Sequence, residues 1–108
     1  MFNKRVFNKI EQIADYYGLT SQADITIEEC GELIQAICKL RRGWSEERYN
    51  NVREEVADVL IMVQQLRVIL GSKYIDKIVE EKLDRQLERI AEEKGNDKCG
   101  ENGEAVSL

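Results

Sequence analysis

Two pairs of acidic residues stand out in this sequence because both have the same spacing inside a helical pattern. Glu29 and Glu32 are three residues apart, and so are Glu55 and Asp58. Residues three apart on an α-helix lie on the same face, one turn from each other. Carboxylates held in this way can bind a hard divalent cation through their oxygen atoms. The spacing therefore indicates metal-assisted chemistry as a candidate function.

The first member of each pair lies within the apolar face of its own helix. On a helical wheel of about 100° per residue, Glu29 and Glu55 are centred among apolar positions, while Glu32 and Asp58 lie nearer the edges. The wheel neighbours are Ile25, Leu33, Ala36 and Leu40 for Glu29, and Val59, Met62, Leu66 and Ile69 for Glu55. A buried carboxylate is costly unless it is paired or bound to metal. We expect all four acids to converge if the two helices pack antiparallel.

Two kinds of partner could satisfy these acids. One is a set of basic side chains later in the chain, which would form salt bridges between helices: Lys77, Lys82, Arg85 and Arg89. The other is a metal ion, and an all-oxygen ligand set favours Mg²⁺ or Mn²⁺. The sequence has no histidine, which argues against a zinc site and against a ferritin-like di-iron centre. Both kinds of partner remain open at this point.

Four carboxylates around one or two magnesium ions suit phosphate chemistry. Two divalent ions offset four negative charges, so that the site can accept a triphosphate, activate a water and stabilise the leaving group. Lys82 and Arg89 are seven residues apart, so they share a helix face and could bind phosphate. They could equally be solvated surface charges. The sequence has no glycine-rich phosphate loop, so metal and side chains would have to hold the phosphates.

Apolar residues recur at helical spacing almost throughout the chain, and there is no proline. The pattern predicts an all-α domain over residues 1–94, an antiparallel bundle of four main helices. We expect these helices over residues 2–17, 21–41, 46–70 and 72–93, with Gly18, Gly43 and Gly71 ending the first three. Residues 95–108 are polar and glycine-rich, which predicts a disordered tail.

The composition narrows the class of protein. A chain of 108 residues is the size of one domain, and a domain this small is often stabilised by self-association. The net charge of −5 argues against a nucleic-acid polymer as partner. The longest apolar stretch, residues 59–63, is too short to span a membrane, and no signal peptide is evident, so we expect a cytoplasmic protein. Cys30, Cys38 and Cys99 form no evident disulfide pair.

At the two acidic pairs and the residues around them, the sequence resembles the MazG-like family of all-α nucleotide pyrophosphohydrolases. The segments ITIEECGELIQAICKLRRG (25–43) and NVREEVADVLIMVQQL (51–66) match the family pattern of EE-x-x-E followed, after a variable spacer, by E-x-x-D. The segment KLDRQLERI (82–90) resembles the family's basic fourth-helix element. Together the similarity spans roughly residues 10–90.

The resemblance implies Mg²⁺-dependent hydrolysis of a nucleoside triphosphate to the monophosphate and pyrophosphate, by a homodimer or tetramer whose pockets can draw on neighbouring subunits. By position, the metal ligands would be Glu29, Glu32, Glu55 and Asp58. Glu28 and Glu54 would hold waters or orient a catalytic base, and together with Glu55 they are the candidate catalytic residues. Lys82 and Arg89 would contact phosphates. Many relatives have an asparagine where this chain has Gln86.

The identity of the base is not evident from the sequence. A base pocket needs aromatic or amide groups, and the aromatic candidates are Tyr16, Tyr17, Trp44, Tyr49 and Tyr74. Trp44 could stack on a base, or it could anchor a loop or a subunit interface. Two alternative functions stay open: a pyrophosphohydrolase of phosphoribosyl nucleotides, and a non-catalytic helical interaction module whose acids form salt bridges.

Overall fold

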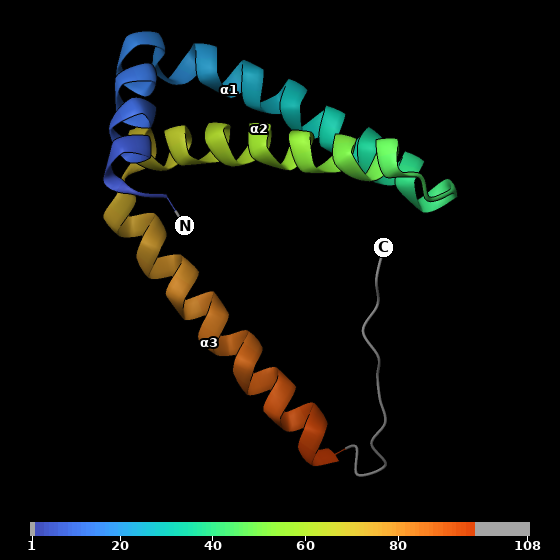
Figure 1. Cartoon of the computed structure of the whole chain (residues 1–108). Helices are drawn as coiled ribbons and strands as arrows, with labels where there is room; N and C mark the ends of the chain where they lie inside the picture. The colour runs from blue at the N-terminus through green and yellow to red at the C-terminus, as the bar shows by residue number, and fades with distance from the viewer. Residues whose placement is uncertain (1, 97–108) are drawn as a thin grey trace. The chain divides into compact units, whose positions relative to one another are not determined.

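A computed structural model describes residues 2–96 of the chain, and these residues form three helices joined by short connections (Figure 1). The helices are α1 (Lys4–Arg42), α2 (Glu46–Leu70) and α3 (Ser72–Asn96). The predicted all-α class is confirmed, and within the described residues there is no strand. The tail predicted from residue 95 lies, apart from its first two residues in α3, outside the described residues.

The prediction of four helices in an antiparallel bundle is wrong in its count. The two helices expected over residues 2–17 and 21–41 are joined at Gly18 without a loop, so that they form the single, kinked element α1. Gly18 alone is non-helical, with φ 83° and ψ 177°, and the helix resumes directly after it. One glycine therefore changes the direction of the chain without a loop (Figure 1).

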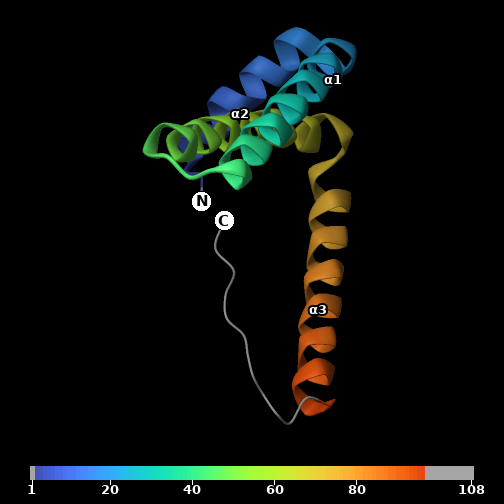
Figure 2. The same cartoon turned by 90° about the vertical axis from the view of Figure 1, so that its right-hand side faces the viewer.

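The chain divides into two compact units, Met1–Ser72 and Lys73–Leu108, and each is described by itself. In the first unit, the part of α1 after Gly18 runs alongside α2 in the opposite direction (Figures 1 and 2). The part before Gly18 reaches the other end of α2, where the Arg67 guanidinium lies 5.9 Å from the centre of the Phe7 ring. The prediction of one domain over residues 1–94 stays a prediction.

The connection between α1 and α2 is short, and both helix ends that it joins are capped. Ser45 accepts a hydrogen bond from the backbone N–H of Arg48 at 3.1 Å and so begins α2, while the N–H of Gly43 donates to Leu40 O at 3.2 Å. The Arg48 guanidinium donates to two carbonyls, Gly43 O at 2.8 Å and Lys39 O at 3.2 Å. It therefore ties the start of α2 to the end of α1.

The core between α1 and α2 is small and contains two polar side chains. Its buried apolar residues are Ile10, Ala14, Ala36, Leu40 and Met62. Gln22 and Gln65 are each only 2% exposed, and Gln22 Nε2 donates a hydrogen bond to Gln65 Oε1 at 2.6 Å. The pairing satisfies polar groups that would otherwise be costly in this position.

In the second unit, α3 has an apolar stripe at helical spacing along Ile75, Ile78, Leu83, Leu87 and Ile90. A stripe of this kind requires a partner surface to bury it. None of the described helices is both long enough and apolar enough to cross a membrane.

Candidate metal centre

Three carboxylates from two helices meet along the seam between α1 and α2. Glu29 and Glu32 come from α1 and Glu55 comes from α2, and each offers an oxygen atom that lies within 4.8 Å of those of the other two. A single cation bound between them would be within reach of all three. Because every donor is an oxygen, the group suits a hard divalent ion such as Mg²⁺ or Mn²⁺.

Asp58 lies beside this cluster rather than among its three closest members. It lines a small hollow together with Glu29, and its negative charge is among the influences that raise the pKa of Glu29. Side-chain contact with Asp58 also raises the pKa of Glu29, and side-chain contact with Glu32 raises the pKa of Glu55. The four acids therefore form two facing pairs, Glu29 with Asp58 and Glu32 with Glu55, as the antiparallel course of the helices requires.

The two acids that the helical wheel centres among apolar residues are the less exposed ones in the structure. Glu29 and Glu55 are half-buried, while Glu32 and Asp58 are exposed, in agreement with their places on the helical wheel. Burial is the largest cause that raises the pKa of Glu29 and of Glu55 above its ordinary value, and the charge of Glu32 is the next for both. All the charged groups that shift these two pKa values are acidic, so neither carboxylate owes its place to a salt bridge.

One oxygen of the cluster is left without a partner. Oε2 of Glu55 is buried and makes no hydrogen bond within residues 2–96. Buried carboxylate oxygens are almost always hydrogen-bonded or bound to metal, because the loss of water is otherwise uncompensated. This atom, set among other carboxylates, fits a metal ligand better than it fits a surface charge.

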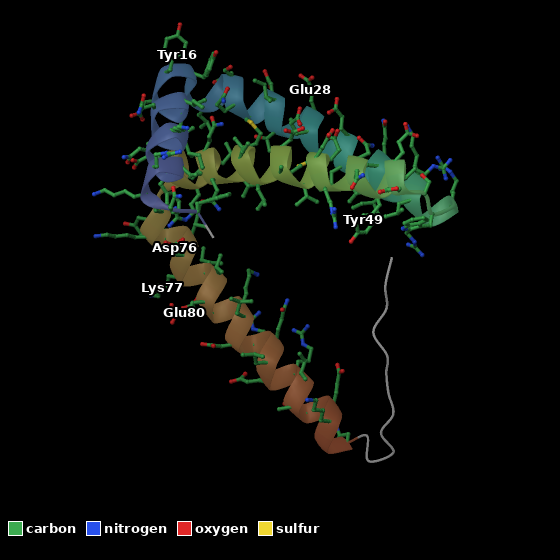
Figure 3. The ribbon with its side chains drawn as sticks, in the orientation of Figure 1. Tyr16, Glu28, Tyr49, Asp76, Lys77 and Glu80 are labelled. Carbon is green, nitrogen blue, oxygen red and sulfur yellow. The ribbon has the colours of Figure 1, made fainter. Side chains whose placement is uncertain are left out.

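The remaining predicted site residues lie in three places. Glu28 is exposed on the side of α1 that is turned away from α2 (Figure 3). Glu54, which precedes Glu55 in the chain, is exposed on α2. Trp44 lies in the connection between α1 and α2 and is 67% exposed. Lys82, Gln86 and Arg89 are on α3, in the second unit, at spacings that put them on one helix face. Their roles stay predictions.

The other aromatic candidates are dispersed. Tyr16 and Tyr17 contact each other edge to face near the bend in α1, with ring centres 4.8 Å apart. Tyr49 lies on the side of α2 away from α1, under the guanidinium of Arg53 at 4.4 Å (Figure 3). Tyr74 is near the start of α3. Within the first unit, none of these tyrosines lines the hollows described below.

The first unit has two hollows, and the smaller one borders the carboxylate cluster. The smaller, of about 220 Å³, is lined by Ile25, Glu29, Asp58, Ile61 and Met62. The larger, of about 630 Å³, lies nearer the connection between the helices and is lined by Lys39, Glu47, Arg48, Asn50, Asn51 and Glu54. Among the residues that line the larger hollow, only Glu54 was predicted from the sequence to be a site residue. The signal that it missed is spacing, because Asn51 is four residues before Glu55 and Lys39 is seven after Glu32.

The chain matches a known protein family over more than half of its length. The family model of the MazG nucleotide pyrophosphohydrolase domain matches residues 18–91. This segment begins at the bend in α1, includes the whole of α2 and ends within α3, and so contains both acidic pairs. No similar protein was found among the curated proteins, and no similar fold among the solved structures.

Proposed function

The chain belongs to the MazG nucleotide pyrophosphohydrolase family, and we propose that it is a Mg²⁺-dependent enzyme that hydrolyses nucleoside triphosphates to monophosphates and pyrophosphate. The observation that carries the proposal is the buried, unpartnered Oε2 of Glu55 within a cluster of carboxylates. An interaction module would not need such an atom, because a solvated or salt-bridged glutamate would serve it equally well and at lower cost.

The ion would be held by Glu29, Glu32, Glu55 and Asp58, and it would supply positive charge to the phosphates and lower the pKa of a bound water. The side chains of the protein would orient the substrate and accept a proton. Oxygen from water forms a bond to the α-phosphorus, the bond from that phosphorus to the α–β bridging oxygen breaks, and pyrophosphate leaves. Glu54, which is exposed and precedes Glu55 in the chain, would accept the water proton. Glu28 faces away from α2 and is less well placed for this step.

The phosphates require cations beyond the metal. Lys82 and Arg89, with Gln86 between them on the same face of α3, supply two positive charges and an amide. We propose that these residues contact the phosphate groups in a homodimer or tetramer, in which the apolar stripe of α3 is buried against other helices. We expect this assembly to work in the cytoplasm.

The test is a panel of ribo- and deoxyribonucleoside triphosphates with Mg²⁺, in which pyrophosphate and orthophosphate are measured separately. Pyrophosphate and a monophosphate as first products support the proposal, and Glu55→Gln should abolish turnover while Glu11→Gln, an exposed glutamate of α1, should not. Orthophosphate as the first product would overturn the attack at the α-phosphorus. If phosphoribosyl nucleotides are cleaved and nucleoside triphosphates are not, the protein is a pyrophosphohydrolase of phosphoribosyl nucleotides instead.

A further inference from the structure

We propose that the larger hollow binds the nucleoside part of the substrate, its base and sugar, while the phosphates lie at the carboxylate cluster. This inference rests on the proposed function and adds to it the place where the base is read. The hollow is lined by Lys39, Glu47, Arg48, Asn50, Asn51 and Glu54.

The first argument is size. Pockets for small ligands commonly have volumes of about 300–1,000 Å³. The larger hollow, at about 630 Å³, is within this range, whereas the one lined by Ile25 and Ile61 has only about 220 Å³. The smaller one borders Glu29 and Asp58 and has room for waters or a phosphate oxygen rather than a nucleoside.

The second argument is position along the seam. Arg48 and Lys39, which are joined by the hydrogen bond from Arg48 to Lys39 O, lie in the same antiparallel register as the facing pairs of acids, nearer the connection. Asn51 precedes Glu55 by about 6 Å along α2, and Lys39 follows Glu32 by about 10 Å along α1, at 1.5 Å per residue. The hollow is therefore in line with the cluster, and a ligand can extend from one into the other.

The third argument is chemistry. The negative charges of Glu47 and Glu54 are balanced by the positive charges of Lys39 and Arg48, so the hollow has no excess of positive charge for a phosphate tail and suits the uncharged end of a nucleotide. The amides of Asn50 and Asn51 offer both hydrogen-bond donors and acceptors, which is what the edge of a base requires, and asparagine is a common partner of adenine in particular. Lys39 adds a donor for sugar hydroxyls.

The wall of the hollow is also held in place. Arg48 is fixed by its bonds to Gly43 O and Lys39 O. Arg53 lies over the Tyr49 ring and donates to Oδ1 of Asn50 at 3.5 Å, which leaves the NH₂ group of that amide for a ligand. Fixed polar groups bind with a smaller loss of conformational entropy than mobile ones.

Binding can be observed directly by NMR of the side-chain amides in the full-length protein without metal. Titration with adenosine, cytidine, guanosine and uridine should shift the resonances of Asn50 and Asn51, whereas inorganic pyrophosphate should not. A shift with pyrophosphate and none with any nucleoside would overturn the proposal. This measurement does not depend on turnover, so it tests the hollow even if hydrolysis is not found.

Enzyme kinetics provide a second test of the proposal. Asn51→Ala should raise KM about tenfold for the preferred triphosphate and reduce the difference in kcat/KM among bases, while the Mg²⁺-induced shift in melting temperature stays as in the wild type. Asn8→Ala, at an exposed asparagine in the early part of α1, is the matched control and should change neither. Alanine favours helix at both positions, so folding should be retained. Unchanged KM and base preference in Asn51→Ala, with an active wild type, would overturn the proposal and leave the function standing.

Discussion

Gln22 and Gln65 form a buried hydrogen bond of 2.6 Å across the seam between α1 and α2, two helical turns from the acidic cluster. Gln22 is seven residues before Glu29, and Gln65 is seven after Asp58, so the amide pair and the facing acids follow one antiparallel register. A sliding of either helix by one turn would break the amide pair and leave only one acid of each helix facing an acid of the other. The pair therefore specifies the alignment on which the metal centre depends.

The first prediction concerns this pair. Gln65→Leu should lower the free energy of unfolding by about 1–3 kcal/mol, because it leaves the buried amide of Gln22 without a partner. The double variant Gln22→Leu/Gln65→Leu should be close to the wild type in stability, since both polar groups are removed. Its Mg²⁺-induced rise in melting temperature should nevertheless be smaller, because the register is less well specified. Urea unfolding and melting curves measure both effects, and a single variant as stable as the wild type would contradict the argument.

The second prediction concerns Glu55 in the absence of metal. Glu55→Gln should raise the melting temperature at pH 7, because it removes a half-buried negative charge that is repelled by Glu32 and Asp58. The same variant should lose most of the stabilisation that Mg²⁺ gives the wild type. Glu11→Gln serves as the control for the loss of one surface charge. A lower melting temperature for metal-free Glu55→Gln would show that this carboxylate has a stabilising partner after all.

The third prediction is a pH dependence. The pKa values of Glu29 and Glu55 are raised in the folded state, so the stability linked to these two groups is full below their ordinary pKa and is lost as the pH rises through the raised values. Metal-free wild type should therefore lose stability, relative to Glu29→Gln/Glu55→Gln, as the pH rises above the ordinary glutamate pKa of 4.5. Mg²⁺ should stabilise the wild type more at higher pH, because its ligands must be deprotonated. Melting curves across pH, with and without Mg²⁺, measure these changes, and a metal-free wild type that gains stability relative to the double variant as the pH rises would contradict the prediction.

Much of this arrangement could be predicted from the sequence because its signals are local. The period of apolar residues located the helices, the glycine and serine at positions 43 and 45 located the connection, and the wheel separated Glu29 and Glu55 from the more exposed Glu32 and Asp58. The facing of the two pairs then followed from an antiparallel arrangement, which short connections favour.

Other features depend on information that a single local pattern does not contain. Gly18 is a normal signal for the end of a helix, but helical structure resumes directly after it, with Ala14 buried on one side of the kink and Gln22 buried on the other. Lys39 and Asn51 are exposed and polar, so they resemble any solvated helix face until the register of the two helices puts them at one hollow. The roles of Lys82, Gln86 and Arg89 stay predictions.

The last prediction uses two glycines of α1 that differ only in backbone conformation. Gly18, at φ 83° and ψ 177°, occupies a region open almost only to glycine, whereas Gly31 is helical, and an added Cβ would meet nothing within 4 Å at either position. Gly18→Ala should therefore lower the free energy of unfolding by about 1–3 kcal/mol through backbone strain alone. Gly31→Ala should raise it by about 0.5–1 kcal/mol, because alanine loses less entropy in a helix. Urea unfolding of the two variants measures both changes. Equal effects at the two positions would show that the bend at Gly18 is not a fixed feature of the folded protein, and the alignment of Gln22 with Gln65 would then need another cause.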